Sequence, residues 1–176
     1  MAVSDAAQIL STASGTPRLD GSVFVAGGAR IIGDVVIEEQ GSVWYNAVVR
    51  GDRAEIRIGA RSNVQDNVSI HVDEGAPVSI GADVSIGHNA VVHGCTIENG
   101  SLIGMGAVVL SGAVIGAGTL VAAGAMVLAG DVIPPGSLVA GVPAKVRRTL
   151  TEEETAGLLR NAAVYLELSV EHAAAR

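Results

Sequence analysis

An aliphatic residue stands at every sixth position over much of this 176-residue chain. The longest uninterrupted run comprises Ile97, Ile103, Val109, Ile115, Val121, Val127, Ile133 and Val139. Four positions after most of these residues stands a small one, such as Ala107, Ala113 or Ala125. This is the period of a parallel β-helix, in which each repeat points one large and one small side chain inward. A sandwich of ordinary strands would instead alternate at period two, with turns every ~8–12 residues.

The same register extends toward the N-terminus with short insertions. Its inward positions there are Val43, Val49, Ile58, Val64, Ile70, Ile80, Ile86 and Val92. We expect the extra residues around "DRAEI" and in "VDEGAP" to bulge from the coil as loops. The pattern therefore predicts an N-terminal tail over residues 1–16 and a single β-helix over residues 17–147.

The last segment leaves the six-residue period. Thr151 and Glu154 form a capping-box pattern, and acidic residues fill the first turn. An apolar stripe at helical spacing follows, made of Leu158, Leu159, Ala162, Tyr165 and Leu166. The prolines just before it end the coil, because proline cannot continue a β-ladder. We predict a C-terminal α-helix over residues 148–176, lying on the β-helix or across a subunit boundary.

These repeats resemble those of the hexapeptide family, whose members form a left-handed β-helix with three hexads per triangular coil. The resemblance implies an all-β fold, a left-handed parallel β-helix with a C-terminal α-helix, and assembly as a homotrimer. The handedness comes from the resemblance alone, since the usual rule for parallel crossovers favours the right-handed sense.

With three hexads per coil, counting along the sequence predicts which residues stack on one another, because residues one coil apart lie roughly 4.7–4.9 Å apart. His71 and His93 then point outward from one face, one coil apart, and Arg50 falls in the same column. His88 belongs to a different face, above Asp66. The first two histidines are close enough to share a metal ion, whereas His88 cannot easily reach them. We therefore expect the third ligand to come from a neighbouring subunit of a threefold assembly.

Three neutral imidazoles with an open fourth position are the arrangement in which zinc makes a bound water acidic. Because all three histidines point outward, a role in the core is excluded for each of them. The alternative is that they are surface histidines without a ligand role.

The composition excludes several classes of function. The formal net charge of −7 provides no basic surface for nucleic acid or for an anionic membrane. Glycines and charges interrupt every apolar run well before the roughly 18 residues that a membrane-spanning helix needs. Cys95 is the only cysteine and cannot form an internal disulfide, and we expect it to be a small packed residue. With no basic leader at the N-terminus, these features favour a cytoplasmic protein.

Five segments resemble the gamma-class carbonic anhydrases over about residues 17–170. They are "VVRGD", "NVQDNVSIH", "SIGHNAVVHGCTI", "GMGAVVL" and "VAGVPAKVRRTLTEEE". The resemblance implies a zinc ion, or iron or cobalt in some members, held by His71, His88 and His93 at a trimer interface. It also implies reversible hydration of CO2 to bicarbonate, with no cofactor beyond the ion.

The same resemblance assigns roles to further residues. Gln65 matches the residue that orients the reacting groups, and Arg50, Asp52 and Asp66 match a charge network at the subunit interface. The predicted stacking supports this network, because Arg50 shares the column of His71 and Asp66 shares that of His88, so the two would meet across subunits. Exposed charges worth less than about 1 kcal/mol each are the alternative. Asp52 could instead bond a ring N–H of a ligand histidine.

The proton route departs from the archetype of the family. Arg53 stands where the archetype has a glutamate, and the loop after His71 is short. Glu74 or Asp73 is the replacement that the sequence offers, with ordinary turn residues as the alternative. The resemblance therefore allows slow turnover. Tyr165 matches a tyrosine that approaches the site in some members, or else anchors the helix to the β-helix.

Two other functions remain open. Many hexapeptide proteins are acyltransferases or handle acyl-CoA between subunits, and end with a segment similar to "GVPAK". They typically use a single histidine as a general base, whereas this chain has three in ligand positions. The chain could also be a non-catalytic, metal-binding scaffold. None of these functions assigns a role to His172 or Trp44. We expect His172 to be solvated and Trp44 to pack against a neighbouring element or subunit.

Overall fold

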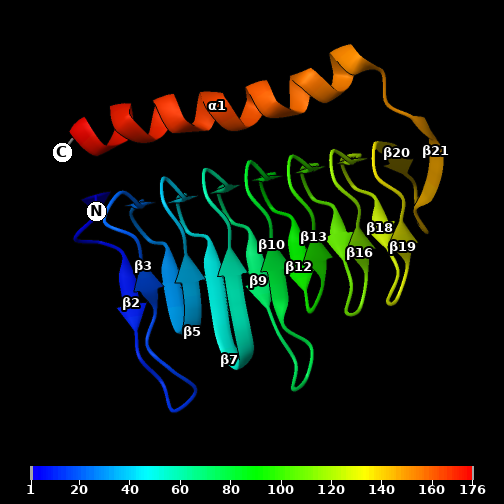
Figure 1. The fold of residues 1–176 in the computed structure, drawn as a ribbon. Helices are drawn as coiled ribbons and strands as arrows, with labels where there is room; N and C mark the ends of the chain where they lie inside the picture. Colours follow the sequence, from blue (N-terminus) through cyan, green and yellow to red (C-terminus); the bar gives the residue numbers. More distant parts are fainter. Residues whose placement is uncertain (1, 176) are drawn as a thin grey trace.

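The computed structural model describes residues 2–175 and is a parallel β-helix with one long α-helix lying along it (Figure 1). The predicted all-β architecture, a left-handed parallel β-helix of hexapeptide repeats with a C-terminal helix, is confirmed. Each coil contributes one short strand to each of three faces, and strands one coil apart pair in parallel. Residues 1 and 176 lie outside the described part of the chain.

The first face, here called the helix-covered face, is a nine-stranded sheet packed against the helix α1 (Glu152–Ala174). Its strands are β1 (Ala2–Val3), β4 (Phe24–Val25), β6 (Ser42–Val43), β8 (Asn63–Val64), β11 (Ser85–Ile86), β14 (Leu102–Ile103), β17 (Leu120–Val121), β20 (Ser137–Ala140) and β21 (Lys145–Thr149). The last of these pairs antiparallel with β20 and leads the chain into α1.

The second face carries two of the predicted ligands and is called the histidine face. It consists of β2 (Gln8–Leu10), the first parts of β5 (Arg30–Ile37) and β7 (Val48–Ile58), β9 (Ser69–His71), β12 (Val91–His93), β15 (Val108–Val109) and β18 (Met126–Val127). The long strands β5 and β7 continue around the edge of the coil and join this face to the third.

The third face is formed by the second parts of those two long strands and by five short ones. The short strands are β3 (Arg18–Leu19), β10 (Val78–Ile80), β13 (Thr96–Ile97), β16 (Val114–Ile115) and β19 (Val132–Ile133). None of the histidines lies on this third face.

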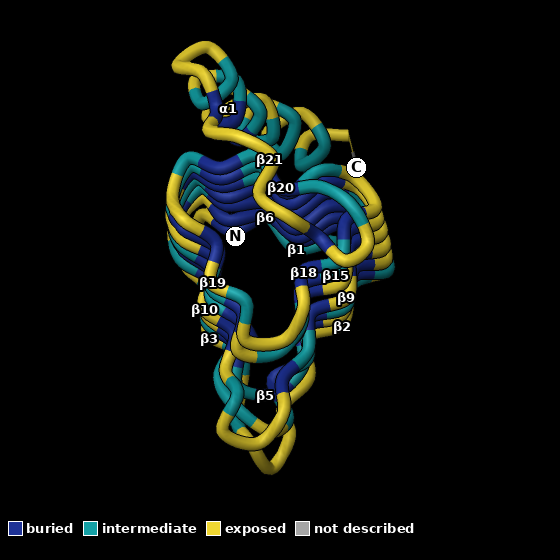
Figure 2. The backbone as a smooth tube through the Cα atoms, turned by 90° about the vertical axis from the view of Figure 1, so that its right-hand side faces the viewer, coloured by how far each residue is buried: buried dark blue, intermediate teal, exposed yellow. Residues whose placement is uncertain are grey.

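The core is a single stack of aliphatic side chains inside the coil. The inward residues that the six-residue period predicts are all buried; Ile70, Ile86 and Ile103, for example, are 0% exposed. Figure 2, seen along the coil, shows buried positions recurring in the walls of successive turns. Cys95 joins this core as predicted, and burial raises the pKa of its thiol to about 12.

Asparagines turn the chain at one corner of the coil. Asn46, Asn67 and Asn89 have φ values of 59°, 59° and 60° and stack in one column between the helix-covered and histidine faces. Asparagine tolerates this left-handed conformation better than other residues with a Cβ. The residue before each asparagine is thereby held at the outer corner, and this places Asp66 and His88 one above the other.

The N-terminal segment differs from the predicted tail over residues 1–16. Strand β1 pairs with β4, and β2 pairs with β5, so these residues form the first coil of the β-helix. The C-terminal boundary also differs, since residues 145–149 form a strand and the helix begins at Glu152. The predicted capping box is present, with the Glu154 N–H donating to Thr151 Oγ1 at 3.2 Å and the Thr151 N–H donating to the Glu154 carboxylate at 2.9 Å.

Aromatic residues attach the helix to the coil. Trp44 packs against Tyr165 with ring centroids 5.3 Å apart and against His172 at 5.0 Å. His172 also bonds the Tyr45 hydroxyl through Nδ1 at 2.9 Å. His172 is therefore half-buried against Trp44, rather than fully solvated as expected. No helix within residues 2–175 combines the length and apolar character needed to cross a membrane.

Candidate metal centre

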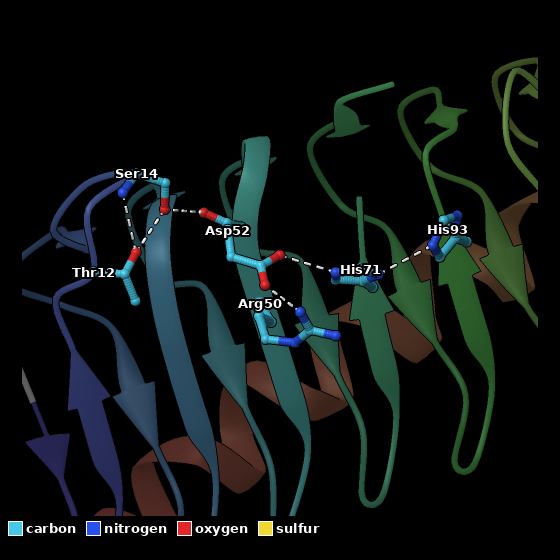
Figure 3. Close-up of polar contacts among 7 residues, drawn as sticks. Thr12, Ser14, Arg50, Asp52, His71 and His93 are labelled. Atoms are coloured by element: carbon cyan, nitrogen blue, oxygen red, sulfur yellow. Dashed lines mark hydrogen bonds and ion pairs between the residues drawn. The ribbon is translucent and has the colours of Figure 1, made fainter. Parts of the chain in front are cut away.

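Two imidazole rings converge on one point of the histidine face. His71 and His93 are register partners at the ends of β9 and β12, and Arg50 of β7 is the partner of His71 on the rung before. This is the column that the repeat count predicts. Nδ1 of His71 lies 3.1 Å from Nε2 of His93, and the two rings meet at an interplanar angle of 61° with their centroids 5.1 Å apart (Figure 3).

In each ring, the nitrogen that lies away from the other histidine contacts a side-chain oxygen. His71 Nε2 lies 2.9 Å from Asp52 Oδ1, and His93 Nδ1 lies 2.9 Å from Ser111 Oγ. A carboxylate can only accept, so the His71 proton sits on Nε2 and Nδ1 presents a lone pair. When the serine oxygen accepts from His93, Nε2 of that ring presents a lone pair as well.

In that tautomer two lone pairs face each other at 3.1 Å, an arrangement that a cation between them stabilises; when the serine hydroxyl donates instead, His93 Nε2–H donates to His71 Nδ1. Two nitrogen ligands of a tetrahedral zinc ion, with bonds of about 2.0–2.1 Å, are separated by roughly 3.3 Å. The observed spacing is close to that value. The donor set of His71 and His93 therefore fits a divalent metal ion.

Asp52 is fixed by its neighbours. It pairs with Arg50 as well as with His71. Burial raises the pKa of Asp52, but the hydrogen bonds from His71 and Arg50 and the charge of Arg50 outweigh burial, and the net pKa lies below its usual value. The first coil also supports this region, because Ser14 Oγ donates to the Gly51 carbonyl at 2.9 Å (Figure 3).

His88 lies in a second group of residues, here called the corner cluster: Gln65, Asp66, His88 and Tyr165. His88 Nδ1 lies 2.7 Å from Asp66 Oδ2, and its Nε2 lies 3.2 Å from the Tyr165 hydroxyl. Gln65 is 5% exposed; it accepts from the His88 backbone N–H at 3.2 Å and donates to Asn63 Oδ1 at 3.0 Å. Within one chain, His88 is thus separate from His71 and His93.

The predicted ion pair between Arg50 and Asp66 is not formed within one chain, where Arg50 pairs with Asp52 and Asp66 pairs with His88. Its formation across subunits stays a prediction. Tyr165 contacts both His88 and Trp44, so it anchors the helix to the coil. Its role at the site stays a prediction. Burial, with a smaller effect from the Asp66 charge, raises the pKa of Tyr165.

In the acidic loop after β9, the carboxylate of Asp73 lies near the histidine pair and that of Glu74 does not. Asp73 Oδ2 lies 3.9 Å from His93 Nδ1. His71, Asp73 and His93 each offer one ligand atom, and these three atoms lie within 4.8 Å of one another. Glu74 is exposed and has no hydrogen-bond or ion-pair partner among residues 2–175.

A pocket of about 540 Å³ lies beside His88, between the helix-covered face and α1. Leu102, Met105 and Leu120 form its apolar part, and Tyr165 and Asn161 line it from the helix. Asn161 Oδ1 is buried and has no hydrogen-bond partner among the described residues.

Sequence reasoning missed Ser111 and Asn161. The signal for Ser111 was present, because the coil between β12 and β15 is 17 residues long and Ser111 stands one position after the residue that follows His93 by one coil. Nothing in the repeat could have found Asn161, since it belongs to the helix and its position depends on how α1 docks.

Comparison with known proteins gives consistent results. The family model described as bacterial transferase hexapeptide (six repeats) matches residues 94–129. A protein of Methanocaldococcus jannaschii named "Probable carbonic anhydrase" is 51% identical over 148 residues, which are 84% of this chain and 93% of that protein. Gamma carbonic anhydrase 1, mitochondrial, of Arabidopsis thaliana is 41% identical over 90% of this chain and 60% of its own length.

Two solved structures share the whole fold. A Bacillus cereus protein, described as a proposed acetyltransferase, superposes with a TM-score of 0.96 at 38% identity and covers 98% of this chain and 100% of its own. A hexapeptide transferase family protein of Anaplasma phagocytophilum superposes with a TM-score of 0.89 at 40% identity, over 93% of this chain and 96% of its own. With the coil, the histidine column and 51% identity to a relative that it matches over most of its length, the chain belongs to the gamma-class carbonic anhydrase family of hexapeptide-repeat proteins.

Proposed function

We propose that this protein catalyses the reversible hydration of CO2 to bicarbonate as a metal-dependent homotrimer. One observation carries the proposal: the facing nitrogens of His71 and His93, 3.1 Å apart, each with the opposite ring nitrogen bonded to a protein oxygen. The names of the relatives from Methanocaldococcus jannaschii and Arabidopsis thaliana support the same reaction.

In this proposal, His71 and His93 of one chain and His88 of the next hold a divalent ion, which is zinc, with iron or cobalt as the other candidates. When bound by three imidazoles with one position open, such an ion makes water acidic near neutral pH and so supplies the nucleophile for CO2. The separation of the corner cluster from the histidine pair within one chain supports a site shared between subunits, because a threefold axis can bring one face against the next corner.

The chain's own residues prepare this site. Asp52 and Ser111 hold the His71 and His93 rings so that their lone pairs face the ion. Asp66 holds the proton of His88 on Nδ1, so Nε2 presents a lone pair. Within one chain this lone pair accepts from the Tyr165 hydroxyl, and in the proposed trimer it faces the ion of a neighbouring subunit. Gln65 fixes the His88 backbone and keeps one amide N–H for an oxygen of the substrate.

The proton leaves through the acidic loop in this proposal. Asp73 is the exposed carboxylate nearest to the histidine pair, and Glu74 is the next residue on the same loop. Neither is held at the site by a strong hydrogen bond, so proton release limits the rate and turnover is slow.

The test is CO2 hydration by stopped-flow pH-indicator assay on the metal-free protein after reloading with zinc, or with iron under anaerobic conditions. We expect activity that rises with bound metal to one ion per chain. His93→Ala should lose both metal and activity, while His172→Ala, a histidine outside the site, should keep both. Metal-loaded wild-type protein that accelerates hydration no more than His93→Ala would contradict the proposal.

Acyl transfer is the second candidate function, and a specific observation favours it. The His88–Asp66 pair resembles a histidine general base oriented by a carboxylate, and His88 lines the 540 Å³ pocket. The names of the Bacillus cereus and Anaplasma phagocytophilum structures point the same way. Binding of acetyl-CoA to the metal-free protein, measured by calorimetry and lost in His88→Ala, would favour this function. Stoichiometric metal without hydration or acetyl-CoA binding would instead indicate a non-catalytic scaffold.

A further inference from the structure

We propose that Asp73 is a conditional metal ligand, which completes a site of two histidines and one aspartate within a single chain when no neighbour supplies His88. The inference rests on the proposed metal site and deepens it. It means that one chain can take up the ion before its neighbour docks, and that His88 of the neighbour then replaces the carboxylate.

The positions of the three donors support this one-chain site. His71 Nδ1 and His93 Nε2 already stand 3.1 Å apart, and the ligand atoms of His71, Asp73 and His93 lie within 4.8 Å of one another. Ligands bound to one zinc ion at about 2.0–2.2 Å are separated by roughly 3–4 Å. The contact of Asp73 Oδ2 with His93, at 3.9 Å, is to Nδ1, on the edge of the ring away from His71. The carboxylate therefore has to swing past this edge of the ring to join His71 Nδ1 and His93 Nε2.

The loop allows this movement without rearranging the coil. The side chain of Asp73 is 65% exposed, and its contact with His93 at 3.9 Å is too long to hold it in place. Its backbone is fixed, because the Asp73 carbonyl accepts from the Ala76 N–H at 3.0 Å in a small bridge that closes the loop. A change of side-chain rotamer on this fixed backbone swings the carboxylate toward the histidines.

The chemistry of the three donors is that of known metal sites. Two imidazoles and one carboxylate bind zinc in hydrolytic enzymes and bind Fe²⁺ with open positions in oxygenases. Glu74 cannot replace Asp73 in this role, because it does not belong to the group of converging ligand atoms. This difference between adjacent acids provides a matched control.

The experiment compares three proteins: His88→Ala, the double variant Asp73→Ala/His88→Ala, and the control Glu74→Ala/His88→Ala. Each is stripped of metal, and its zinc affinity is measured by competition with a chromophoric chelator. The visible spectrum of the cobalt-loaded protein reports the ligand set independently. All the substituted side chains lie outside the core, so size-exclusion chromatography and circular dichroism should show the same fold in each variant.

We expect His88→Ala to keep one zinc ion per chain at lower affinity than the wild type. Loss of an outer partner alone weakens metal binding by about 10–100-fold, so removal of Asp73 from this variant should weaken it by at least about 100-fold more. The Glu74 control should match His88→Ala in affinity and in cobalt spectrum.

Equal zinc affinity in His88→Ala and in Asp73→Ala/His88→Ala would overturn the inference. The inference would also fail if Glu74→Ala/His88→Ala lost as much zinc affinity as the Asp73 double variant, because the loss would then come from the removed charge and not from a lost ligand. In either case tight binding by the wild type would leave the proposed function standing. A wild-type protein that binds no metal would instead contradict the proposed function itself.

Discussion

At the scale of single residues, the site depends on which ring nitrogen carries the proton. Asp52, Ser111 and Asp66 each contact one ring nitrogen of a candidate ligand, and in the proposed site the other ring nitrogen would face the ion. Such outer partners fix the orientation and tautomer of a ligand histidine before the metal arrives. In the proposed site, these partners would lower the cost of metal binding, because the rings are already oriented.

Ser111→Ala tests this arrangement. Without its hydroxyl, the His93 ring loses the partner of Nδ1, and we expect zinc affinity to fall by about 10-fold. Ser79→Ala, at an exposed serine of the third face, should leave the affinity unchanged. Chelator competition measures both values. An unaltered affinity in Ser111→Ala would mean that the hydroxyl does not orient the ring.

At the scale of elements, periodicity predicted the coil but not its ends. The column of Arg50, His71 and His93 follows from counting three hexads, because the core fixes the register of every strand. The first coil was missed although Val3 and Ile9 continue the period. The gap of ten residues from Ile9 to Leu19 equals that between Ile70 and Ile80, with polar residues in between. Strand β2 is exposed because, among residues 2–175, it pairs with β5 alone and its other edge has no partner strand, so its pattern resembles a tail.

Contacts that do not follow the repeat could not be predicted in the same way. Asp52 lies where β7 runs around the edge of the coil, and the position of its side chain depends on how that irregular segment bends. Tyr165 reaches His88 only because α1 docks with its aromatic side against Trp44. Docking depends on side-chain packing rather than on period.

Glu154 gives a prediction about the start of α1. The paired hydrogen bonds from Arg148, each 2.7 Å, and the capping bond from the Thr151 N–H lower the pKa of Glu154 to about 2. The folded pKa lies below the unfolded one, so this stabilisation is complete above the unfolded value and is lost as the pH falls through about 2. Carboxyl NMR titration should show this value for Glu154 and a higher one in Arg148→Ala. A wild-type pKa near 4.5 would contradict the capping geometry.

At the scale of the whole molecule, the three faces have different roles around one core. The helix-covered face carries the corner cluster, the histidine face carries the ligand pair, and the third face carries ion pairs such as Arg57–Glu38. Because every rung packs on the next, the distance between the ligands depends on the stacking of the aliphatic core beneath them. The stability of the coil and the geometry of the candidate site therefore both depend on the packing of this aliphatic core.

Ile86→Ala tests this stack. The side chain is 0% exposed, and its loss leaves a cavity between rungs, so we expect destabilisation of about 2–5 kcal/mol. Val132→Ala, at a valine that is 72% exposed on the third face, should change stability by less than about 0.5 kcal/mol. Urea denaturation of both variants measures the difference. Equal effects would mean that the core does not hold the coil together.

The most direct test of the shared metal centre mixes two defective chains. Chains with Asp73→Ala/His88→Ala keep His71 and His93, whereas chains with His93→Ala keep His88. If the centre needs the histidine pair of one subunit and His88 of the next, trimers made of each chain alone bind no zinc tightly. Trimers containing both chains, separated by two affinity tags, should then bind one zinc ion each, measured by native mass spectrometry. Mixed trimers without zinc, or full occupancy in trimers of His93→Ala alone, would contradict the account.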